Sequence, residues 1–381
     1  EALVEGHGSH RPLEDPHGGR HGEPAATTPS SPTRRVVLRA DATPTIGVGH
    51  AMRLLALAQE LRGRGIEVHL AGDLDVAWVA SAYAEAGVLV HPRPTDPDDL
   101  VTLVLDLDAR WCVLDRYDLG PRWGVWLRRA GVVVMAMVDG PFSADQDADL
   151  YVDQNPGATP RAVGAGQLAL AGADYTLFRD DVLALRRPVG DVAVEDVADE
   201  EQRPLRVLEV FGGTDPCGAA PVVTPLVLQA CSGLAADITV VTPDPTWVAP
   251  LAADAPPGVE LRASGPVSDL AARAAASDLV VTASGSSVWE LMCLGVPLGV
   301  VCVIDNQRPG YDMVADADLA LGLGDLEMLR RDDDARAAAV SALREAFTDR
   351  DVRVERAARA QELLDGRGRA RVAEALVSLA R

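Results

Sequence analysis

His50 is the residue whose type and position best suit it for chemistry. It ends the segment 39–50, which follows a short apolar run at residues 35–38. In residues 51–61 the leucines and alanines recur at helical spacing, so the segment is predicted to be a turn between a strand and a helix. Because ligands of open α/β sheets bind beyond the carboxyl ends of the strands, this position predicts a histidine that faces a ligand.

The start of a helix affects the protonation of a histidine placed there. The positive end of the helix dipole disfavours imidazolium, and a neutral imidazole that faces a pocket is suited to act as a general base. Gly47 and Gly49 allow the backbone to turn tightly and to approach a ligand. The same pattern also fits a strand, a turn and a histidine that merely caps a helix, so both interpretations stay open.

A second turn of small residues, 282–291, follows another apolar run. The hydroxyls of Ser286 and Ser287, together with the backbone N–H groups at the start of the next helix, are suited to bind a diphosphate. Glu290 lies one turn into that helix, where its carboxylate can accept hydrogen bonds from ribose hydroxyls. The alternative is a capping box, because Ser287 and Glu290 have the spacing of that structural motif.

Other polar residues are predicted at the carboxyl ends of strands. Asn306 and Gln307 follow an apolar run and are suited to hold sugar or uracil groups, or else to cap their own loop. Tyr117 ends another strand and can reach a cleft, whereas Asp139 can face either way. A pair of glycines at 212–213 is a weaker signal, since such pairs mark many turns.

Apolar runs alternate with amphipathic stretches after residue 34, which predicts parallel, doubly wound α/β sheets. Strands are predicted at 35–39, 66–70, 111–115, 131–138, 150–153, 206–211, 237–242, 278–283 and 297–304. Helices are predicted at 50–63, 75–86, 121–130, 217–232, 266–276 and 286–294.

Two Rossmann-like domains that face a cleft follow from this pattern, because each half opens with a strand that runs into a glycine turn. Residues 34–187 form the first predicted domain and residues 205–330 the second, with an acidic, proline-bounded linker at 188–204. Residues 1–33 lack periodicity and are expected to be a disordered tail. Residues 331–381 are expected to form C-terminal helices with one Gly-rich break.

The composition excludes several classes of function. The 381 residues carry a formal net charge of −22, which argues against binding to nucleic acids or to anionic membranes. The chain contains no lysine, which excludes a lysine Schiff base, and its five cysteines lack the paired spacing of a metal site. We therefore expect no metal and no cofactor. No apolar run reaches the ~18 residues of a membrane span, and we expect a cytoplasmic protein of undetermined oligomeric state.

A series of short motifs occurs in order from residue 35 onward. They are Arg39-Ala40-Asp41, Ile46-Gly47-x-Gly49-His50-x-x-Arg53, Asp115-x-Tyr117, Asp153-Gln154-Asn155, Gly172-x-x-Tyr175-x-Leu177-x-Arg179, Gly212-Gly213-x-Asp215, Ser286-Ser287-x-x-Glu290, Asn306-Gln307 and Asp365-Gly366-x-Gly368. This ordered set resembles the UDP-sugar hydrolases of pseudaminic-acid biosynthesis, which act on UDP-2,4-diacetamido-2,4,6-trideoxy-β-L-altropyranose. It is also similar to the related spore-coat polysaccharide biosynthesis proteins.

The resemblance implies a GT-B-like fold, with the nucleotide mainly on the second domain. It implies that His50 activates water for attack at the anomeric carbon, with loss of UDP, inversion of configuration and no need for a metal. The further contacts that it implies are to the substrate from Arg39, Asp41, Gly47, Gly49, Tyr117, Asn306 and Gln307, and to the nucleotide from Gly212, Gly213, Ser286, Ser287 and Glu290. Two departures from the pattern are present. Asp139-Gly140-Pro141 lies in a loop expected to shape the sugar site and leaves the exact sugar open, whereas Gly285 makes the phosphate turn a slightly rearranged version of the relatives' turn.

The main prediction is a hydrolase that releases UDP from a UDP-linked amino-deoxy sugar. The alternative is a GT-B glycosyltransferase, because an acceptor hydroxyl that replaces water leaves no motif of its own. A third class is a nucleotide-sugar binding subunit without catalysis. That class predicts a decayed histidine turn, and the turn in this chain is intact.

Overall fold

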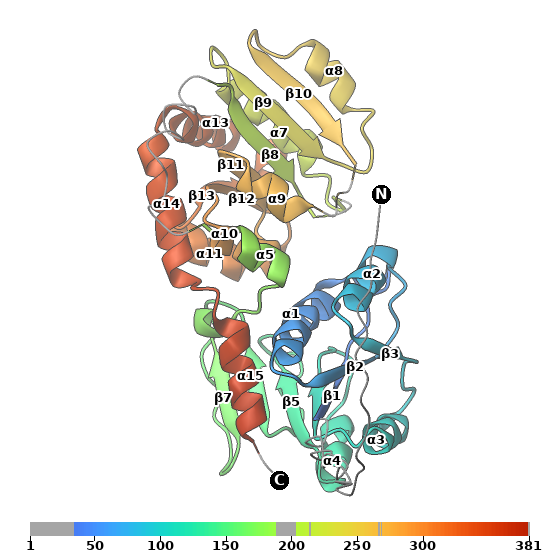
Figure 1. Ribbon diagram of the computed structural model, residues 1–381. Helices are drawn as coiled ribbons and strands as arrows, with labels where there is room; N and C mark the ends of the chain where they lie inside the picture. Colours follow the sequence, from blue (N-terminus) through green and yellow to red (C-terminus); the bar gives the residue numbers. More distant parts are fainter. Residues whose placement is uncertain (1–33, 188–202, 213–214, 266, 268, 380–381) are drawn as a thin grey trace, which may run out of the picture. The chain divides into compact units, whose positions relative to one another are not determined.

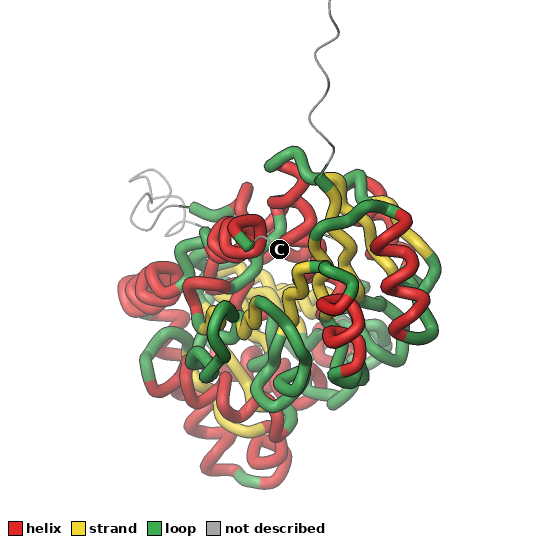
Figure 2. The backbone as a smooth tube through the Cα atoms, turned by 90° about the horizontal axis from the view of Figure 1, so that it is seen from below, coloured by secondary structure: helices red, strands yellow, loops and turns green. Residues whose placement is uncertain are grey.

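The computed structural model describes residues 34–187, 203–212, 215–265, 267 and 269–379 (Figure 1). The predicted tail at 1–33 and most of the predicted linker lie outside these residues, and so does Gly213. The described chain contains two parallel sheets with helices on both faces, which confirms the predicted α/β class. Figure 2 shows the strands lying within a cover of helices and loops.

The first sheet has seven parallel strands in the order β3-β2-β1-β4-β5-β6-β7. They are β1 (Arg35–Arg39), β2 (Glu67–Ala71), β3 (Leu89–His91), β4 (Trp111–Leu114), β5 (Val133–Met137), β6 (Leu150–Asp153) and β7 (Leu168–Ala171). Arg39 pairs with Ala71 on one side and with Leu114 on the other, so the ends of β1, β2 and β4 are level. The residues that follow these strands therefore lie along one edge of the sheet.

Alternate residues of β1 point to opposite faces of this sheet, as the two-residue period of a strand requires. Val36 and Leu38 join the core beneath α1 (Gly49–Gly63), α2 (Ala77–Glu85) and α15 (Gly368–Ser378). Val37 joins the core beneath α3 (Pro97–Asp106) and α4 (Arg122–Arg129). The connections from β5 to β6 and from β6 to β7 contain no helix, and residues 138–149 and 154–167 are loops.

The second sheet has six parallel strands in the order β10-β9-β8-β11-β12-β13. They are β8 (Leu205–Val210), β9 (Ala236–Val241), β10 (Val259–Ser264), β11 (Leu279–Ala283), β12 (Leu298–Cys302) and β13 (Leu321–Asp325). The remaining helices are η1 (Ala173–Tyr175), α5 (Asp180–Leu185), α7 (Ala220–Ala230), α8 (Val248–Ala253), α9 (Leu270–Ala275), α10 (Ser287–Leu294), η2 (Asp305–Gln307), α11 (Arg308–Asp316), α12 (Leu326–Arg331), α13 (Asp333–Thr348) and α14 (Arg350–Leu363). Helix α5 packs against α9 and α10, whereas α15 returns to pack against α1.

All strands predicted from the sequence are found, with ends that differ by at most two residues. The four strands that were not predicted, β3, β7, β10 and β13, are the edge strands of the two sheets. Edge strands are partly exposed, so they lack the continuous apolar runs that identify the central strands. In β13 the alternating glycines of Leu321–Asp325 hide the pattern.

Candidate active site

The predicted base, His50, is the second residue of α1 and lies beside a buried carboxylate from the neighbouring strand. Its Nδ1 is 2.7 Å from Oδ1 of Asp115, which directly follows β4 and is fully buried. Burial raises the pKa of Asp115, but the charge and hydrogen bonds of Arg53 and then the His50 hydrogen bond outweigh burial and hold that pKa below its ordinary value. An ionised carboxylate only accepts hydrogen bonds, so the bond to Asp115 places a proton on Nδ1 of His50. Nη2 of Arg53 also lies 3.2 Å from this Nδ1.

Arg53 fixes the position of the Asp115 carboxylate. Its Nε donates to Oδ2 of Asp115 at 2.6 Å and its Nη2 donates to Oδ1, which is a bidentate pair. Because Arg53 follows His50 by three residues, both side chains lie on one face of α1. Burial lowers the pKa of Arg53, but the charge and the hydrogen bonds of Asp115 raise that pKa by more than burial lowers it. The guanidinium therefore stays charged.

Two aromatic side chains lie next to this group and remain half exposed. The Tyr117 ring meets the His50 ring edge to face, with centroids 4.4 Å apart, and stacks on Phe142 at 4.5 Å. The Tyr117 hydroxyl donates to Asp139, whose other oxygen accepts from Asn155 Nδ2 at 2.9 Å. Burial and then the Asp139 carboxylate raise the pKa of Tyr117, so its hydroxyl stays a neutral donor. Asp139 therefore faces Tyr117, a question that the sequence left open.

Arg39 and Asp41, which the resemblance implied as substrate contacts, form a buried ion pair at the end of β1. Both side chains are buried, with 1% and 0% of their surfaces exposed, and they form an ion pair at 2.9 Å. Asp41 also accepts from the backbone N–H of Asp73 at 2.8 Å and pairs with Arg116. These contacts brace the ends of β1 and β2, and the substrate contact expected of Arg39 and Asp41 stays a prediction.

The glycine turn before His50 has the geometry that was predicted from its sequence. Gly47 adopts a positive φ of 84°, which residues with a Cβ rarely adopt, and its N–H donates to the carbonyl of Thr43 at 2.9 Å. Helix α1 then begins at Gly49, and its N-cap residue Val48 provides no side-chain cap. The backbone N–H groups of this first turn therefore have no acceptor in the side chain of the N-cap residue.

The second predicted turn begins α10 and has no capping box. The N-cap residue is Ser286, and it makes no side-chain cap hydrogen bond. Glu290 instead forms an ion pair with Arg179 at 3.0 Å, which leaves the structural alternative without support. Within the described residues, no backbone hydrogen bond from the N–H of Ser286 or Ser287 is found, so this turn can receive an anion.

Gln307 packs against this turn, whereas Asn306 is exposed. Oε1 of Gln307 lies 3.4 Å from the N–H of Val303 and 3.5 Å from the hydroxyl of Ser284. A Cβ at Gly285 would lie 3.3 Å from Nε2 of Gln307, which explains why a glycine suits that position of the turn.

The turn after β8 differs from the one after β11. Gly212 has a φ of 75°, and Asp215 accepts from the N–H groups of Ala219 and Ala220 at 2.8 and 2.9 Å. A carboxylate of the chain therefore already occupies the N-terminus of α7. At α10, by contrast, no side-chain cap hydrogen bond is found within the described residues.

Sequence reasoning assigned no role to Arg53, Asp115, Asn155 or Arg179. The signal for Arg53 was its spacing from His50, one helical turn away. The signal for Asp115 was its position at the end of a strand, but its partner became evident only because β4 lies next to β1 in the sheet.

Within the described part of the chain, no group of three or more side chains is arranged to hold a metal ion. The five cysteines are free thiols, and all but Cys217 are buried. Among the described helices, none has the length and apolar character needed to cross a membrane.

Comparison with known proteins identifies the fold. No protein-family model matches the chain, and no curated protein matches its sequence. MurG of Acinetobacter baumannii matches with a TM-score of 0.66 and 16% identity, over 91% of this chain and 100% of that chain. A putative UDP-N-acetylglucosamine 2-epimerase from Listeria monocytogenes matches with a TM-score of 0.58 and 12% identity, over 91% and 96%. CalG4, the calicheamicin glycosyltransferase, matches with a TM-score of 0.57 and 16% identity, over 91% and 98%.

These likenesses confirm the predicted GT-B-like class, with two Rossmann-like sheets. At identities of 16% and below they establish the fold alone. The resemblance to UDP-sugar hydrolases stays a prediction.

Proposed function

We propose that the protein transfers a sugar from a nucleotide sugar, with UDP as the nucleotide, to an acceptor hydroxyl. The observation that carries the proposal is the 2.7 Å hydrogen bond between His50 Nδ1 and the buried Asp115 carboxylate, which in a neutral imidazole leaves Nε2 as the nitrogen that can accept a proton. Histidine held in this way by a carboxylate is a general base whose tautomer is fixed. The fold neighbours include a glycosyltransferase and a putative epimerase of a UDP-sugar, which supports a nucleotide sugar as the substrate.

The reaction assigns a role to each group. The acceptor hydroxyl gives its proton to Nε2 of His50 while its oxygen attacks the anomeric carbon from the side opposite the diphosphate. The bond from that carbon to the diphosphate oxygen breaks, the nucleotide leaves, and the configuration inverts. Asp115 stabilises the imidazolium that forms, and the N–H groups of Ser286 and Ser287 stabilise the charge on the leaving diphosphate.

The test is nucleotide release from UDP-glucose and UDP-N-acetylglucosamine, measured with and without a panel of hydroxyl acceptors. We expect release to depend on the acceptor and kcat to fall by about 10²–10⁴ in His50→Asn, because that is the usual contribution of a general base. The affinity for UDP, measured by calorimetry, should stay unchanged. His91→Asn, on the edge strand β3, is the matched control and should keep full activity. Full activity in His50→Asn would contradict the proposal.

Hydrolysis of a UDP-linked amino-deoxy sugar is the second candidate. One observation favours it: Arg53, Asp115 and Tyr117 surround His50 and leave 11% of its side chain exposed, which suits a nucleophile as small as water. The motif set described above supports the same reaction. In that case nucleotide release needs no acceptor, and NMR of the products detects the free sugar with inverted configuration. A product whose configuration at C2 has changed would instead indicate epimerisation, the reaction named for the putative UDP-N-acetylglucosamine 2-epimerase.

A further inference from the structure

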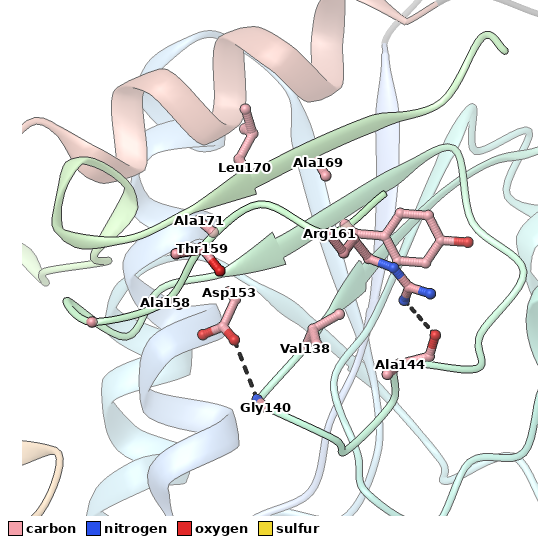
Figure 3. A pocket seen from close by; sticks show the side chains of 12 residues that line it. Val138, Gly140, Ala144, Asp153, Ala158, Thr159, Arg161, Ala169, Leu170 and Ala171 are labelled. Carbon is pink, nitrogen blue, oxygen red and sulfur yellow. Dashed lines mark hydrogen bonds between the residues drawn. The ribbon is translucent and has the colours of Figure 1, made fainter. Parts of the chain in front are cut away.

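The loops that join β5 to β6 and β6 to β7, together with β6 and β7 themselves, line an open cavity of about 410 Å³ (Figure 3). The cavity lies on the face of the first sheet that α3 and α4 cover at the neighbouring strands. Here the connections 138–149 and 154–167 are loops, and they leave a hollow where a helix would otherwise pack. A volume of this size lies within the range of small-molecule sites.

The floor of the cavity is apolar and its rim is polar. Val138 and Tyr151 form the floor together with small alanine side chains, whereas Asp153 and Arg161 lie on the rim. An apolar floor of this kind suits the C–H face of a saturated ring, while a carboxylate and a guanidinium suit its hydroxyl groups as acceptor and donor. This combination of surfaces favours a carbohydrate over a purely apolar ligand.

Both rim side chains are held in place by the protein. Asp153 accepts from the N–H of Gly140 at 3.2 Å and from Asn155 Nδ2 at 2.9 Å. The guanidinium of Arg161 lies 4.3 Å from the centre of the Tyr151 ring and donates to the carbonyl of Ala144. No ion pair to Asp153 is found within the described residues, so its carboxylate keeps lone pairs for a ligand.

Hydrogen bonds connect the cavity to the base. Asn155 Nδ2 donates both to Asp153 in the cavity and to Asp139, each at 2.9 Å. Asp139 in turn accepts from Tyr117, whose ring contacts His50. The cavity and His50 therefore lie on the same edge of the sheet and share one polar network.

We propose that this cavity binds a sugar ring of the acceptor, adjacent to the ring that carries the reacting hydroxyl. The inference rests on the proposed glycosyl transfer and names its second substrate as a carbohydrate. Asp153 accepts hydrogen bonds from hydroxyls of the bound ring, and Arg161 donates to the same ring. An acceptor that lacks this ring would be used poorly even though its reacting hydroxyl is unchanged.

Binding is tested first, without any need for turnover. Saturation-transfer NMR on the full chain with UDP added would use N-acetylglucosamine and methyl β-D-glucopyranoside as probes and cyclohexanol as the ring without sugar hydroxyls. We expect signals from the two sugars in the wild type. Ala169→Leu fills the floor of the cavity from β7, and Asp153→Asn removes the rim charge while it keeps the shape. Ala165→Leu adds the same atoms in an exposed part of the loop, outside the lining, and is the matched control.

The expected result is a dissociation constant for the sugars that rises at least about tenfold in Ala169→Leu and Asp153→Asn and stays unchanged in Ala165→Leu. Equal signals from all four proteins, or no signal from either sugar in the wild type, would overturn the inference. Unchanged UDP affinity in Ala169→Leu shows that the variant is folded.

Kinetics separate this inference from the proposed function. If the wild type transfers sugar and Ala169→Leu keeps the wild-type KM for a disaccharide acceptor, the cavity is not the acceptor site, whereas the proposed function stands. If the sugars bind as expected but no acceptor supports nucleotide release, the proposed function fails although the cavity binds carbohydrate.

Discussion

Glu209 offers a test of the structure that does not depend on the identity of any substrate. Its side chain in β8 is fully buried against α7. Thr224 donates a hydrogen bond to Oε2 at 2.9 Å, but Oε1 has no partner within the described residues. Burial raises the pKa of Glu209 from 4.5 to about 8, and the Thr224 hydrogen bond offsets only part of that effect. The carboxyl is therefore protonated in the folded protein at neutral pH.

The sign of the pH dependence follows from this raised pKa. Between pH 4.5 and about 8 the folded chain holds a proton that the unfolded chain has lost, so the free energy of unfolding falls as pH rises. Each pH unit in this interval removes about 1.4 kcal/mol. Over the whole interval, 8 less 4.5, the loss amounts to about 5 kcal/mol. The contribution is fully present below pH 4.5 and lost above about 8.

Glu209→Gln keeps the shape of the side chain and removes its titration. Urea unfolding of the wild type and the variant, repeated across this pH interval, gives the difference between their free energies of unfolding. We expect the wild type to lose about 1.4 kcal/mol per pH unit relative to the variant, and the difference to level off above the folded pKa. Glu260→Gln on the exposed face of β10 is the control and should show no such slope. A difference that stays constant with pH would refute a protonated Glu209.

The other predictions concern the site and its support. Asp115→Asn should lower kcat by about 10²–10⁴, because the amide can present its NH₂ group to Nδ1 of His50 in place of an oxygen that accepts a hydrogen bond. The pH–rate profile should change while the affinity for UDP stays the same, and both are measured. Tyr117→Phe keeps the ring contact but loses the hydrogen bond to Asp139, so KM for the acceptor should rise while UDP affinity measured by calorimetry stays the same. Gly72→Ala should prevent folding, because its Cβ would lie 1.7 Å from the carbonyl oxygen of Ala40. Gly63→Ala, whose Cβ meets nothing within 4 Å, should leave the melting temperature unchanged or slightly raised.

The central strands could be predicted from the sequence because burial on both faces requires continuous apolar runs. The edge strands could not, and Leu89–His91 of β3 shows the reason, since both its leucine and its valine are exposed. Glycine and proline signals were enough to locate the turns before His50 and α10. The order of the strands was not predictable, because it depends on packing between residues far apart in the chain.

The polar residues of the site were likewise predictable only in part. His50 and Tyr117 were predicted from their positions after strands, and the structure brings their rings into contact. Arg39 and Asp41 also end a strand, but they pair with each other inside the protein. Residue type and strand position do not distinguish an exposed polar group from a buried ion pair, since that choice depends on what the neighbouring strands contribute. Asp115 became a partner of His50 for the same reason.

The two halves of the proposed site handle charge in different ways, and this difference fits the proposed chemistry. Around His50, the buried pair of Asp115 and Arg53 supplies fixed charges, so the imidazolium forms beside a carboxylate that is already ionised. At α10, Arg179 is paired with Glu290 and Asp181, so a diphosphate would meet mainly backbone N–H groups and the helix dipole. In a chain with a net charge of −22, neutral donors of this kind are the groups that we propose to stabilise the departing diphosphate.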